Sequence, residues 1–155
     1  MYIKPIIAIA LIISAALMAA KFSPEINTEQ FRQGKYIHVD SIEIDFDKTD
    51  ANLNMRYHLS PFAEAYMFLF GSKNLEPKIR EIFANFTEVK ILQIGRNSTS
   101  LQITNISRKK DQNYLHDSRE LGLSTDTLIL VSPQGTRRLE NQNSTGNFFY
   151  WYQES

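Results

Sequence analysis

The N-terminus constrains this chain more than any other segment. It begins MYIKPIIAIALIISAALMAAKF, and the fifteen residues from Ile6 to Ala20 carry no charge. At 1.5 Å per residue, a helix of that length spans roughly 22 Å, and the twenty residues 3–22 span roughly 30 Å, the thickness of a bilayer's hydrocarbon core. We therefore expect residues 1–22 to be a signal-anchor or a signal peptide.

The segment fits an uncleaved anchor better than a cleaved signal. A cut after Ala16 has small residues in the required places, but it leaves too short an apolar stretch before it. Cuts after Ala19 or Ala20 put a large residue three positions before the cut. A buried core helix fits poorly, because core helices rarely are apolar on every face. The expected location is a single-pass membrane protein with its C-terminal part outside the cytoplasm, or a secreted protein if the segment is removed.

Four sequons agree with export. They are Asn85-Phe-Thr, Asn97-Ser-Thr, Asn105-Ile-Ser and Asn143-Ser-Thr. Each matches the acceptor pattern for N-glycosylation, so the chain is expected to be a glycoprotein.

Composition limits the rest of the chain to a small domain without thiol chemistry. Residues 23–34 are polar without a clear period and form the expected tether, which leaves residues 35–155 as one extracytoplasmic domain. Seventeen basic and seventeen acidic residues cancel, so no net field favours nucleic acid. The chain has no cysteine, which excludes thiolate metal sites and disulfides.

The first elements expected in the domain are a hairpin and two helices. Residues 36–47 and 51–59 alternate apolar and polar side chains, and a slip of phase near Asp40 indicates a bulge. In this hairpin Glu43 and Asp45 are expected opposite Arg56 and Asn54. Ser60 as N-cap, Pro61 in the first turn and Gly71 at the end predict a helix, and a second, amphipathic helix follows from Leu75 to Phe86.

Strands are expected to dominate the remainder. Residues 88–94 and 99–106 predict a second hairpin, and residues 127–131 (TLILV) predict an inner strand. Residues 136–140 and 146–152 predict two weaker strands, and a short helix is expected from Asp111 to Leu121. The fold class is therefore α+β, with a mostly antiparallel sheet of five to seven strands and two consecutive helices on one face.

The acidic cluster near the first hairpin turn has three interpretations. Asp45-Phe-Asp-Lys-Thr49 resembles the first motif of the haloacid-dehalogenase-like phosphatases, a resemblance that implies a nucleophilic Asp45, an acid–base Asp47 and Mg²⁺. That family also requires a preceding parallel strand, a following helix and later paired aspartates. A Ca²⁺ loop would use Asp45, Asp47 and Asp50, but it lacks the glycine and the bidentate glutamate. A solvated hairpin face is the favoured interpretation, so no metal or other cofactor is assigned.

The histidines offer another metal site. His38 and His58 would come together with a carboxylate if the first two strands pair far from their turn. His116 stands beside Asp117 and Ser118, but sequence neighbours do not converge on one reacting atom.

Aromatic residues give the strongest functional signal. The C-terminal run Phe148-Phe-Tyr-Trp-Tyr152 must direct half of its rings away from the core if it is a strand, and the first helix has almost no polar face. The expected binding surface comprises Phe149 and Trp151 on the strand and Phe68 and Phe70 on the helix. Trp and Tyr are favoured at partner and membrane interfaces.

The sequence thus predicts a binding module more than an enzyme. We expect a membrane-tethered domain that contacts the membrane through its N-terminal helix, possesses no nucleic-acid site and binds another envelope protein or the bilayer surface. The alternatives are a small metal-dependent hydrolase that uses Asp45 and Asp47, and a passive structural protein of the envelope.

Overall fold

The computed structural model describes residues 36–152. The expected anchor, residues 1–22, and the expected tether, residues 23–34, lie outside the described residues. Within residues 36–152, no helix is both long enough and apolar enough to cross a membrane.

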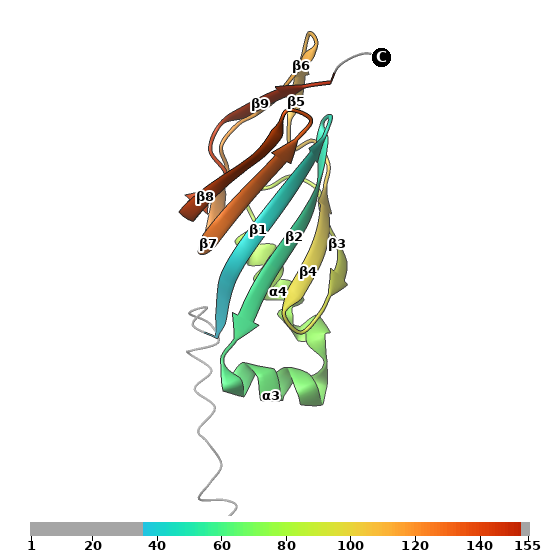
Figure 1. The fold of residues 1–155 in the computed structure, drawn as a ribbon. Helices are drawn as coiled ribbons and strands as arrows, with labels where there is room; N and C mark the ends of the chain where they lie inside the picture. The colour runs from blue at the N-terminus through green and yellow to red at the C-terminus, as the bar shows by residue number, and fades with distance from the viewer. Residues whose placement is uncertain (1–35, 153–155) are drawn as a thin grey trace, which may run out of the picture. The chain divides into compact units, whose positions relative to one another are not determined.

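Two β-sheets and two short helices make up the described part of the chain (Figure 1). The larger sheet has six strands, in the order β3 (Val89–Ile94), β4 (Ser98–Ile103), β2 (Asp50–Leu59), β1 (Ile37–Asp47), β7 (Glu120–Ser132) and β8 (Gly135–Ser144). Strands β1 and β7 pair in parallel, and the other neighbours are antiparallel. The smaller sheet is antiparallel, in the order β5 (Arg108–Lys110), β6 (Asn113–His116) and β9 (Phe148–Trp151).

The helical segment connects β2 to β3. Helix α3 (Pro61–Phe70) begins at Ser60, whose side chain accepts a hydrogen bond from the Ala63 N–H, and it ends at Gly71. A 3₁₀ turn, η1 (Ser72–Leu75), leads into α4 (Glu76–Ile82). The two helices, the Ser60 and Gly71 caps of α3 and the mixed α and β class are as expected. Helix α4 ends before Phe83 and Phe86, which are buried in the segment that follows it.

The core lies between one face of the large sheet and α4. Alternate residues of β1 and β2 are buried, and Ile79 and Ile82 of α4 are fully buried beside them. Gly122 of β7 passes so close to this helix that a Cβ would lie 2.6 Å from the Glu81 carbonyl oxygen. Helix α4 therefore lies behind the sheet, whereas α3 lies across the end of β2 (Figure 1).

The expected helix at residues 111–121 is wrong. This segment contains the turn of the β5–β6 hairpin, with Asp111 in the left-handed region at φ 57°, then strand β6 and the start of β7. Tyr114 and His116 are buried on alternate positions, which is the period of a strand. The larger sheet, with six strands of which only one pair is parallel, agrees with the expected mostly antiparallel sheet of five to seven strands. The sequence pattern did not predict that β5, β6 and β9 form a second, separate sheet among residues 36–152.

Candidate metal centre

The candidate site lies on the polar face of the large sheet, opposite the face that buries the core. A bulge in β1 places Asp40 between the cross-strand pairs Val39–Tyr57 and Ser41–Arg56, so no residue of β2 lies directly opposite it. This confirms the slip expected near Asp40. The expected charge pairs are wrong, because the two-residue turn after Asp47 sets a register in which Glu43 faces Asn54 and Asp45 faces Asn52.

His38 and His58 lie directly opposite each other on β1 and β2. Their ring centroids are 4.7 Å apart, and both side chains point to the exposed face of the sheet. The first two strands do pair far from their turn, as a site built on both histidines requires. The register of the hairpin explains this pairing. The two-residue turn after Asp47 pairs Asp47 with Asp50, and the one extra residue at the bulge then brings His38 opposite His58.

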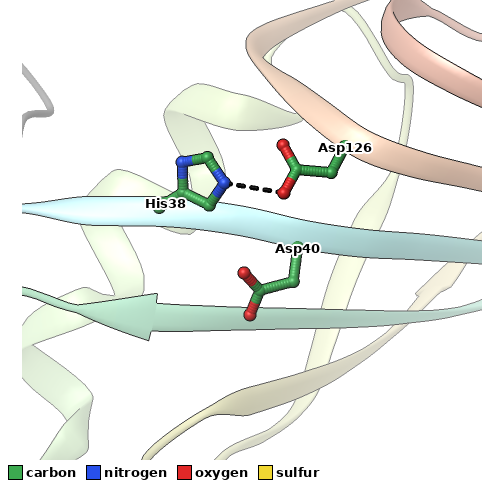
Figure 2. A group of neighbouring side chains, drawn as sticks. All are labelled: His38, Asp40 and Asp126. Atoms are coloured by element: carbon green, nitrogen blue, oxygen red, sulfur yellow. Dashed lines mark hydrogen bonds and ion pairs between the residues drawn. The ribbon is translucent and has the colours of Figure 1, made fainter.

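Two carboxylates complete the cluster. The His38 Nε2 atom lies 2.9 Å from Asp126 Oδ2, and the His58 Nδ1 atom lies 2.7 Å from Asp40 Oδ1. Asp126 belongs to β7, where it stands between Thr125 and Thr127, the residues in register with Val39 and Ser41. Figure 2 shows His38 and Asp126 directed toward each other, with Asp40 beside them on the same strand as His38.

Three of these side chains have the spacing of a metal-ligand set. One ligand atom each from His38, Asp40 and Asp126 lies within 4.8 Å of the others. Ligand atoms around a tetrahedral zinc ion, with bonds of about 2 Å, are roughly 3.3 Å apart, so small side-chain rotations would bring the three into place. Imidazole and carboxylate ligands suit borderline divalent ions such as Zn²⁺, Co²⁺ and Ni²⁺. His58 would orient the Asp40 carboxylate through their hydrogen bond without contacting the metal ion, as hydrogen-bonding partners of metal ligands do in many sites.

The cluster is open to solvent. The side chains of His38 and Asp126 are 51% and 56% exposed, and those of His58 and Asp40 are 64% and 43% exposed. Polar contacts between side chains this exposed contribute about 0–1 kcal/mol to stability. Substitutions in the cluster should therefore leave the domain folded.

The acidic residues near the hairpin turn do not form such a set. Among residues 36–152, Asp45, Asp47 and Asp50 are not a group whose ligand atoms converge within this distance. Asp50 instead accepts a hydrogen bond from the Asn105 N–H at 3.1 Å. The motif also runs from β1 directly into the antiparallel β2, so the strand-to-helix context of the phosphatase family is absent from this hairpin.

Sequence reasoning identified the two histidines but not Asp126. Its position depends on the parallel pairing of β7 with β1, about ninety residues away along the chain. The local pattern Thr125-Asp-Thr127 before an apolar run carries no sign of that pairing.

The aromatic residues of β9 divide as an alternating strand requires. Tyr150 is fully buried, whereas Phe149 is 62% exposed and Trp151 is 42% exposed. The two outward rings stack with centroids 6.2 Å apart. They line a cavity of about 300 Å³ together with Ser132, Gln134, Arg137, Asn147 and Phe148.

The other expected surface residues are also exposed. Phe68 and Phe70 of α3 are 79% and 64% exposed. All four sequon asparagines have exposed side chains: Asn85, Asn97, Asn105 and Asn143.

Comparisons of the chain with protein-family models, with curated proteins and with solved structures found no match.

Proposed function

We propose that this chain is a membrane-tethered module, facing away from the cytoplasm, that binds a divalent transition-metal ion through His38, Asp40 and Asp126. The observation that carries the proposal is the convergence of three ligand atoms from two strands that are distant in sequence. The tether and its direction are supported by the uncharged N-terminal segment and the four exposed sequons.

The proposed activity is binding, not turnover. The three ligand side chains are about half exposed on an open sheet face, so a substrate held there would remain in contact with water. Three protein ligands leave coordination positions free for water or for a group from a partner. The hydrolase alternative remains a prediction, and Asp45 and Asp47 lack a converging third ligand among the described residues.

Thermal unfolding with and without added metal tests the proposal. Zn²⁺ at about one hundred times its dissociation constant should stabilise the fold by about 2.7 kcal/mol, because it binds only the folded state. For a domain of this size the melting temperature should rise by roughly 10 °C. EDTA should reverse the shift, and the double variant His38→Gln/Asp126→Asn should abolish it.

A matched control separates this site from the acidic hairpin. Asp45→Asn removes a carboxylate from the same exposed face of β1 but not from the cluster, so the Zn²⁺ shift should persist. The proposal fails if Zn²⁺ produces no shift, or if the shift survives in the double variant. A Ca²⁺ shift that Asp45→Asn removes would instead assign the site to the acidic residues at the turn.

The exposed pair Phe149 and Trp151 favours a second binding surface. Stacked rings beside a cavity with Arg137 offer an apolar contact and one cationic group, as hot spots of protein interfaces do. We propose that an envelope protein binds there.

A further inference from the structure

We propose that the outward surface of α3 lies in the interfacial layer of the membrane to which the chain is tethered. This inference rests on the tether of the proposed function but not on the metal site. It assigns the bilayer surface itself, and not a second protein, as the partner of this helix.

Helix α3 is apolar on the side that faces away from the core. Only Ala63 and Met67 are buried. Leu69 follows Met67 by two residues, so it lies about 200° around the helix, on the opposite side. Leu69 is 71% exposed. A helix on the surface of a water-soluble domain normally places polar side chains there.

The exposed apolar side chains of α3 also point in several directions, whereas those that contact a flat protein surface point in one. Phe68, Leu69 and Phe70 are consecutive, so successive side chains point about 100° apart and leave the helix on three sides. A single flat partner covers one side, whereas lipid can surround all three. Glu64 is the only charged residue of the helix.

The chain enters the described domain beside this helix. The Ser60 N–H, at the N-cap of α3, donates a hydrogen bond to the carbonyl oxygen of Tyr36 at 2.9 Å. Tyr36 is the first described residue, and the uncharged segment 6–20 precedes it by only fifteen residues. A membrane span in that segment would therefore keep α3 close to the bilayer, and such a high local concentration makes even weak docking effective.

The residues after α3 suit the polar side of that interface. Gly71 ends the helix, and Lys73, which is exposed, follows two residues later. A lysine beside an apolar surface can extend its ammonium group to lipid phosphates while its methylene groups stay near the acyl chains.

The absence of cysteine from the chain allows a site-specific test in the full-length protein. The variant Leu69→Cys takes a single environment-sensitive fluorophore, and the protein is reconstituted into phosphatidylcholine/phosphatidylglycerol vesicles. The matched variant Phe149→Cys carries the same label on β9, at the other end of the sheet from α3 (Figure 1). Circular dichroism checks that both variants fold.

The label at position 69 should shift to shorter emission wavelength and be quenched several-fold more by nitroxide-bearing lipids than the label at position 149. This difference should persist when the protein is diluted to less than one chain per vesicle. Equal quenching at both positions, or stronger quenching at position 149, would overturn the proposal. Protection at position 69 that disappears on dilution would also overturn it and assign the surface to a second copy of the chain.

Discussion

The buried imidazole of His116 on β6 shows how one residue can hold two connecting segments, the one between β4 and β5 and the one between β8 and β9. Its side chain, in a residue only 1% exposed, accepts or donates through both ring nitrogens, with Nδ1 3.0 Å from the Ile106 carbonyl oxygen and Nε2 2.7 Å from Thr145 Oγ1. The Arg119 N–H donates to the same hydroxyl at 3.0 Å. The carbonyl accepts only, so Nδ1 carries the proton, Nε2 accepts from Thr145, and the neutral ring satisfies every partner.

This environment predicts a loss of stability in acid. Burial lowers the pKa of His116 below its usual value of 6.5, and nearby Arg119 lowers it further, although the bond to Ile106 and the charge of Asp117 act in the opposite direction. Between the lowered pKa and about 6.5, the unfolded chain binds more protons than the folded one. The contribution of His116 is therefore complete above about pH 6.5 and is lost as the pH falls toward the folded-state pKa.

The variant His116→Phe tests this prediction by urea unfolding between pH 5 and pH 8. At pH 8 it should lose about 1–3 kcal/mol, because the Ile106 carbonyl and the Thr145 hydroxyl lose their partner. Its stability should then fall less steeply than that of the native chain as the pH decreases. The exposed substitution His58→Gln is the control, and parallel profiles for His116→Phe and the native chain would contradict the assignment.

At the scale of the element, β9 combines a core strand with an open surface. Tyr150 stacks on Tyr114 and packs against Phe46, and its hydroxyl donates to the Lys48 carbonyl at 2.6 Å. Burial raises the pKa of Tyr150 to about 12. Through Tyr150, β9 of the small sheet contacts the turn of the first hairpin. The alternate residues of β9, Phe149 and Trp151, face outward.

This alternation predicts opposite results for neighbouring substitutions. Tyr150→Ser should cost about 3–5 kcal/mol in the free energy of unfolding, because it empties a buried site and removes the bond to Lys48. Phe149→Ser and Trp151→Ser should each change it by less than about 1 kcal/mol, since their rings are substantially exposed. Denaturant unfolding measures all three. Unfolding of the Phe149 and Trp151 variants would show that these rings are core, and would remove the proposed protein-binding surface.

The sequence pattern predicts correctly the elements that neighbouring residues determine. It does not predict the elements that depend on pairing with a strand far away in the sequence. The cap at Ser60, the stop at Gly71 and the alternation of β1 and β2 are each determined by a few neighbouring residues, and all are confirmed. The helix expected at residues 111–121 is wrong because β6 pairs with β9, about thirty-five residues later. The sequence near β6 carries no sign of that pairing. The metal cluster divides in the same way: register placed His38 near His58, whereas Asp126 arrives through a parallel pairing.

At the scale of the whole described domain, the three proposed binding surfaces, for a metal ion, a protein and the bilayer, lie on different parts of the fold. The metal cluster lies on the open sheet face, the Phe149–Trp151 pair lies on the small sheet, and α3 lies where the chain enters. The sequon asparagines are spread over four further places: after α4 (Asn85), in the β3–β4 turn (Asn97), after β4 (Asn105) and on β8 (Asn143). Because all four are exposed, glycans there would leave the buried core untouched.

The mass of the native protein tests the location on which these surfaces depend. Protein recovered from the membrane fraction should have its full-length mass plus glycan, because an uncleaved anchor keeps residues 1–22 and an outward-facing domain exposes its sequons to glycosylation. Replacing the exposed Asn97 with Gln should remove one glycan increment, whereas Asn141→Gln on β8, outside any sequon, should remove none. An unmodified full-length mass in the soluble fraction would contradict both the anchor and the outward orientation. It would also leave α3 without a bilayer to contact, whereas the metal cluster, which needs no membrane, would remain testable by its Zn²⁺ shift.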